Sequence, residues 1–168
     1  MENLYYSVYS HPVIGRLYVI ASDEELITLA IGEDDFERES KKYPAVRKHD
    51  HPLFQQLFPL LDSYFSGREV DFQIPLRTAG TPFQRAVWEQ MKLIPYGETR
   101  SYSEIAEEIN RPKAVRAVGQ ASRANPFPFI VPCHRIVGKS GALTGYAGSR
   151  VNIKEWLLQL EKKTTPSV

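Results

Sequence analysis

The single cysteine of the chain, Cys133, is followed directly by His134 and Arg135. A cysteine reacts as the thiolate, and nearby positive charge or a hydrogen-bonded base favours that form. A lone cysteine is most often a small buried apolar residue, but two potentially cationic neighbours argue against that role here. The residue types therefore indicate a nucleophilic thiol, with His134 as the group that accepts its proton.

The conformation of the backbone around Cys133 decides whether its thiol can contact the imidazole of His134. We expect residues 127–136 (FPFIVPCHRI) to be extended, and adjacent side chains of an extended segment point to opposite faces. Contact between Cys133 and His134 would then require a bridging water or a bent backbone. A third group should orient the imidazole, as in hydrolase triads. Glu161 is one candidate, which the sequence alone does not distinguish from the other acids.

Cysteine usage and composition narrow the possible classes of protein. One cysteine excludes an intramolecular disulfide and any metal site that needs two thiolates, so we expect no metal and no cofactor. Hydrophobic residues make up 42% of the chain, which is enough for a buried core. The sequence has no signal peptide and no apolar run near the roughly 20 residues of a membrane helix. We therefore expect a cytoplasmic protein that does not associate with membranes.

The first part of the sequence predicts a small antiparallel sheet with helices. Three short runs rich in Tyr, Val, Ile and Leu are expected to form a meander of strands: residues 3–10, 15–22 and 25–32. Next come a charged loop or exposed helix, a helix interrupted by Pro59, and a strand: residues 34–50, 51–67 and 69–76. The character of the sequence changes near residues 76–80, so we place a support domain at 1–78 and a second domain at 79–168.

The second part is predicted to be mainly helical. Thr81 and Pro82 are expected to start a helix, and Ser101 with Glu104 forms a capping-box pattern at the start of another. The expected helices are residues 83–94, 101–109, 114–125 and 151–163. The second and third of these are short and joined by a tight break. That spacing fits a helix-turn-helix, and it fits any corner of two helices equally well.

The helix at 114–125 is rich in small residues, whereas a helix that reads the major groove usually presents Arg, Asn or Gln to base edges. Ala117 and Gly119 would let it approach a surface closely, which suits the narrow minor groove. Arg116 and Arg123 are two turns apart on roughly one face, where they could meet phosphates. Alternatively, the small residues pack against another helix and both arginines are solvated. Taken without Cys133, this helix favours the alternative.

Longer motifs point to a family. The stretch Pro132-Cys133-His134-Arg135 resembles the active-site motif of the O6-alkylguanine-DNA alkyltransferases, the methylated-DNA–protein-cysteine methyltransferases. Four segments resemble signatures of this family in the family's order and cover nearly all of residues 80–161: residues 81–106, 112–137, 140–148 and 154–161. The resemblance implies an α/β (α+β) fold. A small RNase H-like antiparallel sheet with helices would precede a mainly helical domain with a winged helix-turn-helix.

The resemblance implies direct-reversal DNA repair by a methylated-DNA–[protein]-cysteine S-methyltransferase. Such a protein binds double-stranded DNA through the minor groove and flips the alkylated base out of the stack. It would take the alkyl group from O6-methylguanine, and from O4-methylthymine, onto Cys133. His134 would take the thiol proton through water, Glu161 would hold the imidazole, and Asn125 would brace the turn beneath. A thioether is a poor leaving group, so each molecule would act once, as a monomer and without a cofactor.

The family pattern also assigns residues that meet the DNA and the substrate. Tyr102 would contact the DNA and help protonate the leaving guanine, Arg116 would fill the space of the flipped base, and Arg123 would meet phosphate. Ala117 and Gly119 belong to the same DNA-binding surface. The substrate pocket would be walled by Pro128, Ile136, Tyr146, Ala147 and Gly148. Some family members hold zinc through cysteines in the first domain, and the absence of a second cysteine predicts that this site is missing.

Three other functions remain open at this point. A cysteine hydrolase would use Cys133 and His134, but such enzymes draw their histidine from elsewhere in the fold. A non-catalytic sensor of alkylated DNA keeps the DNA-binding surface but lacks the acceptor cysteine, which is present here. An ordinary transcription factor should carry major-groove readers on its second helix.

Overall fold

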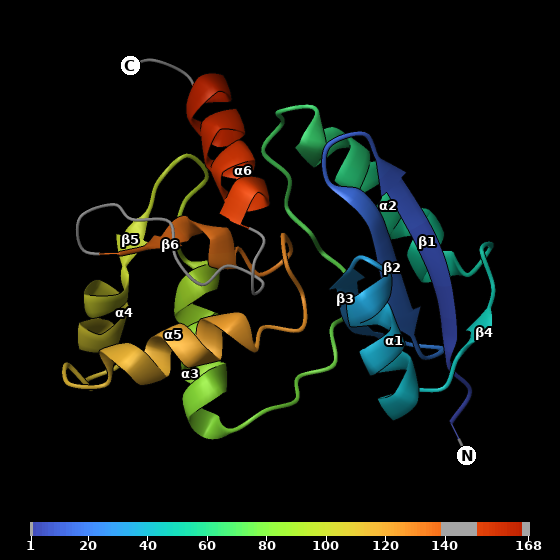
Figure 1. Cartoon of the computed structure of the whole chain (residues 1–168), viewed down its shortest axis with the longest axis horizontal. Coiled ribbons are helices and arrows are strands. Elements are labelled where there is room, and N and C mark those ends of the chain that lie inside the picture. The colour runs from blue at the N-terminus through green and yellow to red at the C-terminus, as the bar shows by residue number, and fades with distance from the viewer. Residues whose placement is uncertain (1, 139–150, 166–168) are drawn as a thin grey trace. The chain divides into compact units, whose positions relative to one another are not determined.

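The computed structural model describes residues 2–138 and 151–165. The chain divides into two compact units, Met1–Arg77 and Thr78–Val168. Within the described residues, no helix combines the length and the apolar character needed to cross a membrane. The elements of both units are labelled along the chain in Figure 1.

The first unit is built on a four-stranded sheet (Figure 1). Its strands are β1 (Tyr5–His11), β2 (Gly15–Ala21), β3 (Leu26–Ile31) and β4 (Val46–Arg47). The first three form the predicted antiparallel meander, whereas β4 pairs parallel with β1, which gives the spatial order β3-β2-β1-β4. Both β2 and β3 are buried along most of their length, so the core lies against the half of the sheet formed by these two strands.

Two helices complete this unit. The charged stretch forms a helix, α1 (Glu33–Lys42), which has no buried residue and has acidic residues in its first turn and basic residues in its last, as the helix dipole favours. The second helix, α2 (Pro52–Phe65), runs through Pro59 instead of being interrupted there. Pro59 is exposed, so the backbone bond that it cannot make is lost on the solvent side. The opposite side of α2 buries Leu53, Phe54, Leu57, Leu61, Tyr64 and Phe65.

The strand predicted at residues 69–76 does not form, so this prediction was wrong. A single parallel bridge joins Leu76 to Leu26. The Leu26 N–H donates to the Pro75 carbonyl at 2.9 Å, and the Arg77 N–H donates to the Leu26 carbonyl at 2.8 Å. Because Pro75 has no N–H and disfavours regular pairing, alternation of apolar residues is not enough to extend a ladder here.

The second unit is mainly helical, as predicted. Its elements are α3 (Pro82–Lys92), β5 (Arg100–Ser101), α4 (Tyr102–Glu108), α5 (Val115–Arg123), the 3₁₀ helix η1 (Cys133–Arg135), β6 (Ile136–Val137) and α6 (Val151–Thr164). The strands β5 and β6 form a parallel pair. Complete capping boxes start two of the helices, Thr81 with Gln84 at α3 and Ser101 with Glu104 at α4, which confirms the predicted starts.

The helices α4 and α5 form the predicted helix pair, and both pack on α3 (Figure 1). The indole N–H of Trp88 in α3 donates to the Ala121 carbonyl of α5 at 2.8 Å. Val118 and Ala121 are buried on this side, so part of the small-residue helix does pack against its neighbours. The other side of α5 is exposed and consists of Arg116, Ala117, Gln120, Arg123 and Ala124.

Candidate active site

The chain that leads to the cysteine is folded back around Asn125. The carboxamide of this residue accepts a hydrogen bond from the Phe127 N–H at 3.0 Å and donates one to the Val131 carbonyl at 2.8 Å. Between them, Phe129 has a φ of 73°, a left-handed conformation that is uncommon for a bulky residue. Asn125 thus holds both ends of a tight loop that ends just before Cys133.

Residues 133–135 form one turn of 3₁₀ helix, and our prediction of an extended segment was wrong there. The Cys133 N–H donates to the Val131 carbonyl at 2.8 Å around Pro132, and the Arg135 N–H donates to the Pro132 carbonyl at 3.0 Å. Adjacent side chains point to opposite faces only in an extended segment, so this rule does not apply to Cys133 and His134. Both Cys133 and His134 are buried, with 4% and 0% of their surface exposed.

The thiol of Cys133 is buried beside polar and charged groups. Burial raises its pKa to about 11, while a hydrogen bond from the Asn125 side chain and the positive charge of Lys154 act in the opposite direction. A raised pKa favours the thiol form in the free protein at neutral pH. The proton must leave to a base within the site when the sulfur reacts.

His134 and Glu161 form a buried pair that links η1 to α6. Nε2 of His134 lies 2.7 Å from Oε2 of Glu161, and Glu161 is only 1% exposed. Burial lowers the pKa of His134. Burial alone raises the pKa of Glu161, but the hydrogen bond from His134 and the Arg135 guanidinium hold it well below its usual range. A neutral imidazole beside a carboxylate donates from Nε2, so Nδ1 is the nitrogen that can accept a proton.

Two further side chains belong to this cluster: Arg135, which the sequence analysis named only as a neighbour of the thiol, and Lys154, which it did not place in the site. Arg135 donates to both carboxylate oxygens of Glu161. Lys154 is 1% exposed, and burial lowers its pKa to about 8, although the charge of Cys133 acts to raise it. The helical period contained a signal for Lys154, because residues 154, 157 and 161 share one face of α6 and Leu157 on that face is fully buried. A lysine on a buried face indicates a partner for its charge.

Tyr102 connects the buried cluster to α5. The Nζ atom of Lys154 lies 5.9 Å from the centroid of the Tyr102 ring. A methyl group at Gly119 would lie 3.8 Å from the same ring, so α5 passes close to it. Beyond Gly119, the exposed side of α5 presents Arg116 and Arg123 to solvent. One aromatic residue thus lies between the buried charges and a basic helix face.

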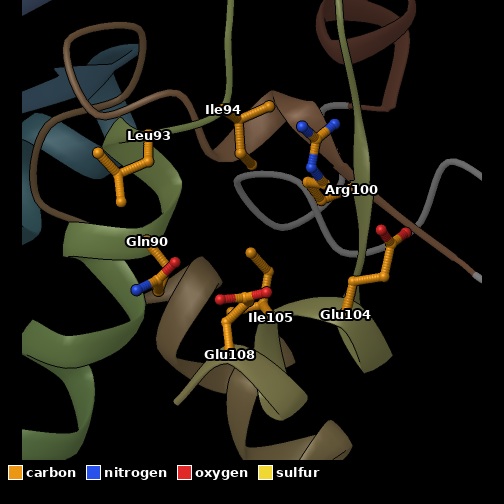
Figure 2. Close-up of a pocket in the computed structure, with 7 residues that line it drawn as sticks. All are labelled: Gln90, Leu93, Ile94, Arg100, Glu104, Ile105 and Glu108. Carbon is orange, nitrogen blue, oxygen red and sulfur yellow. The ribbon is translucent and has the colours of Figure 1, made fainter.

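Only part of the predicted substrate pocket can be compared with the structure. Pro128 and Ile136 are buried on either side of the cysteine in the sequence, and Ile136 pairs with Arg100. Tyr146, Ala147 and Gly148 lie outside the described residues. A separate cavity of about 180 Å³ (Figure 2) is lined by Gln90, Leu93, Ile94, Arg100, Glu104, Ile105 and Glu108. Since neither the thiol nor the histidine lines it, this cavity is not the alkyl-group pocket.

Metal ligands do not gather in the described part of the chain. Among residues 2–138 and 151–165, no group of three or more His, Cys, Asp or Glu side chains could hold a metal ion. His134, Arg135 and Glu161 are instead paired with one another. The chemistry that this arrangement supports is nucleophilic attack by sulfur with proton transfer to imidazole.

Two family models match consecutive parts of the chain. Residues 4–78 match the ribonuclease-like domain of 6-O-methylguanine DNA methyltransferase. Residues 82–163 match the DNA-binding domain of 6-O-methylguanine DNA methyltransferase.

Whole proteins show the same similarity. A constitutive methylated-DNA–protein-cysteine methyltransferase of Bacillus subtilis is 40% identical over 158 residues, which cover 94% of this chain and 95% of that protein. The Haemophilus influenzae methylated-DNA–protein-cysteine methyltransferase is 44% identical over 165 residues, with 96% and 88% covered. The crystal structure of Mycobacterium tuberculosis O6-methylguanine methyltransferase has a TM-score of 0.86 at 41% identity, covering 98% of this chain and 96% of that one. OGT of the same organism in complex with DNA has a TM-score of 0.84 at 40% identity, with 97% and 96% covered.

Proposed function

Because the chain belongs to the family of methylated-DNA–protein-cysteine methyltransferases, we propose that Cys133 is the residue that accepts the alkyl group. The protein is a DNA-repair methyltransferase that acts by direct reversal. The observation that carries the assignment of Cys133 is its setting. The only cysteine of the chain adjoins the buried His134–Glu161 pair, and the positive charge of Lys154 acts to lower its pKa.

The proposed transfer moves one alkyl group and involves two proton transfers, one away from sulfur and one to the leaving guanine. The sulfur of Cys133 forms a bond to the alkyl carbon while the bond from that carbon to O6 of guanine breaks. The thiol proton passes to Nδ1 of His134, directly or through a water, and Glu161 balances the charge of the imidazolium. Tyr102, next to Lys154, supplies a proton to the leaving guanine. The thioether cannot release the alkyl group again, so each molecule acts once.

The DNA-binding part of the proposal rests on the exposed side of α5. O6 of guanine is out of reach inside a duplex, so the alkylated base must turn out of the stack before sulfur can attack it. Ala117 is exposed on this face and Gly119 lies beside Tyr102, so the helix can approach a minor groove closely. Arg116 fills the place of the extruded base, and Arg123 binds a phosphate. Tyr102 is then the residue that lies near both the buried cluster, through Lys154, and α5, through Gly119.

The proposal also covers the substrate range, the location of the protein and the roles of its two domains. The substrate is O6-alkylguanine in double-stranded DNA, and O4-methylthymine is a second substrate. The protein acts as a monomer in the cytoplasm, without a membrane and without a cofactor. Residues 79–168 carry the DNA-binding face and the acceptor thiol, and residues 1–78 form the support domain. Pro128, Ile136, Tyr146, Ala147 and Gly148 wall the pocket for the extruded base.

Mass spectrometry tests the proposal directly. The protein is incubated with a duplex that contains one O6-methylguanine, and with the same duplex without the methyl group. We expect each protein molecule to gain the mass of one methyl in place of hydrogen, on the peptide that contains Cys133, and only with the methylated duplex. Cys133→Ala should bind the duplex and gain nothing. Repeated turnover would point to a hydrolase, and binding without any adduct would point to a sensor of alkylated DNA.

A further inference from the structure

The carboxylate of Glu161 is held by more donors than a histidine–carboxylate pair requires. Its Oε2 atom meets Nε2 of His134 at 2.7 Å and Nη2 of Arg135 at 3.0 Å. Its Oε1 atom accepts from Nε of Arg135 at 2.9 Å and from the Gly97 N–H at 3.0 Å. The guanidinium thus forms a two-pronged contact, which fixes the plane of a carboxylate as well as its position.

Arg135 is itself seated on a tight turn at residues 95–98. Its Nη1 atom donates to the Ile94 carbonyl at 2.8 Å, and its guanidinium lies 5.6 Å from the centre of the Tyr96 ring. The third nitrogen of the guanidinium, Nη1, therefore binds the backbone just before the turn. With only 12% of its side chain exposed, Arg135 has little freedom to release Glu161.

The turn is shaped by glycine and tied to α6. The Glu98 N–H donates to the Pro95 carbonyl at 3.1 Å, and Gly97 has a φ of 82°, which side chains rarely tolerate. A side chain at Gly97 would also collide with Thr165. The hydroxyls of Tyr96 and Thr164 lie 2.6 Å apart. The turn is thereby connected to the helix that carries Glu161.

We propose that Arg135, seated on the turn at residues 95–98, is a positioning residue for alkyl transfer. It fixes Glu161 in the orientation that keeps Nε2 of His134 as a donor and Nδ1 as the acceptor of the Cys133 proton. This inference deepens the proposed function and rests on it. A carboxylate without the guanidinium could rotate, and the imidazole would lose its defined orientation.

The charges around His134 predict how the loss of Arg135 changes the pH dependence of the transfer rate. The groups that face the imidazole are Glu161 and Lys154 from α6, Arg135 from η1, and the thiol of Cys133. Burial lowers the pKa of His134, Glu161 raises it, and the positive charges of Arg135 and Lys154 lower it. Removal of the Arg135 charge therefore raises the pKa of His134. Because the base must be neutral to accept the thiol proton, the transfer rate then begins to fall at a higher pH on the acid side.

Three variants test the proposal by single-turnover methyl transfer from an O6-methylguanine duplex across a range of pH. Arg135→Gln should transfer about 10- to 100-fold more slowly, as when partners that orient histidine ligands are removed, and the acid side of its rate profile should move to higher pH. Arg135→Lys keeps the charge but not the two-pronged contact, so we expect a slower rate with the wild-type pH profile. Lys163→Gln removes an exposed charge from the helix that carries Glu161 and should match wild type in both respects.

Each rate is divided by the folded fraction from circular dichroism, so that loss of structure is not counted as loss of chemistry. The proposal is overturned if folded Arg135→Gln has the wild-type rate and pH profile. If Arg135→Gln does not fold, Arg135→Lys decides, and a wild-type rate in that variant overturns the proposal. A wild-type protein that gains no methyl group would refute the proposed function itself, which is a different outcome from equal rates in wild type and variants.

Discussion

The two units of the chain bury different kinds of polar group. In the described part of the first unit, the buried polar side chains are Ser7, Ser22, Thr28 and His51. His51 illustrates their use, because its Nε2 meets the Ser22 carbonyl at 3.0 Å and its Nδ1 accepts from the Leu53 N–H at 3.0 Å, which fastens the start of α2. The second unit buries the neutral Ser122 and Asn125 and, in addition, the ionisable His134, Lys154 and Glu161.

Burial of ionisable groups lowers stability unless each charge is compensated, and apolar residues of similar size would often stabilise a fold better. The first unit follows the rule for a stable core, with hydroxyls and one histidine satisfied mainly by the backbone. The second unit departs from it at one cluster, around Cys133. The difference indicates that the buried polar groups serve packing in the first unit and chemistry in the second. Substitutions in the two units should therefore affect different measurements.

The largest effect on chemistry is expected from Glu161→Gln. The amide keeps the shape of the side chain, but it no longer balances an imidazolium and leaves the Arg135 charge without its carboxylate. We expect methyl transfer per folded molecule to slow by about 10²- to 10⁴-fold, the usual contribution of general base catalysis. The measurement is single-turnover kinetics on an O6-methylguanine duplex. A rate within threefold of wild type would remove Glu161 from the proposed mechanism.

The largest effect on stability is expected from Phe54→Ala in the first unit. Phe54 has 0% of its surface exposed and stacks on Phe58 with ring centres 5.9 Å apart. Truncation of a buried phenylalanine costs about 3–5 kcal/mol of unfolding free energy, which urea titration measures. The rate of methyl transfer per folded molecule should stay at the wild-type value. Val46→Ala, at a residue that is 69% exposed, is the matched control and should change neither quantity.

The same division explains which parts of the molecule the sequence predicted. The meander of β1 to β3 and the helices α2 to α6 follow from local signals, namely alternation, helical period and the capping residues Thr81 and Ser101. The strand at residues 69–76 failed because alternation was weighed without the missing N–H of Pro75. Local signals thus predicted the longer helices and strands, whereas the two-residue strands β4, β5 and β6 depend on pairing with distant segments and were not predicted.

The backbone of the site could not be predicted by the same means. Its bend depends on two hydrogen bonds that the Asn125 side chain makes, one as donor and one as acceptor, and on the left-handed backbone conformation of Phe129. Neither feature has a periodic signature in the sequence. The proximity of Gly97 and Glu161 joins residues 64 positions apart. Residue types around Cys133 could indicate a reactive thiol, whereas its burial, and therefore its raised pKa, required the tertiary structure.

A smaller effect, of opposite sign for stability and activity, is expected from Lys154→Met. The pKa of Lys154 is lowered from 10.5 to about 8, so the folded state disfavours its charged form by about 3 kcal/mol. This penalty is fully present below pH 8, where lysine is charged in both states, and it disappears as the pH rises through 10.5. Lys154→Met should therefore unfold at higher urea concentration than wild type at pH 7, and transfer methyl more slowly because the sulfur loses a positive neighbour.

The control for this substitution is Lys162→Met, on the exposed side of the same helix. It should leave stability within about 0.5 kcal/mol of wild type. If Lys154→Met lowers stability at neutral pH, then the charge of Lys154 is compensated in the resting protein. In that case burial of Lys154 would not lower the stability of the second unit. The contrast between the two units would then not include this residue.

The smallest effect is expected at the exposed face of α5, where Arg123 is proposed to bind a phosphate. An exposed cation that contacts one phosphate contributes through release of counterions, so Arg123→Ala should reduce the slope of log affinity against log salt concentration by about 0.9. Fluorescence anisotropy with an unmodified duplex measures this slope. Methyl transfer at saturating protein should be unchanged, because Arg123 lies outside the buried cluster. Lys162→Ala removes an equal charge from α6 and should leave the slope as in wild type. Equal slopes for wild type and Arg123→Ala would mean that Arg123 does not bind a phosphate in the complex.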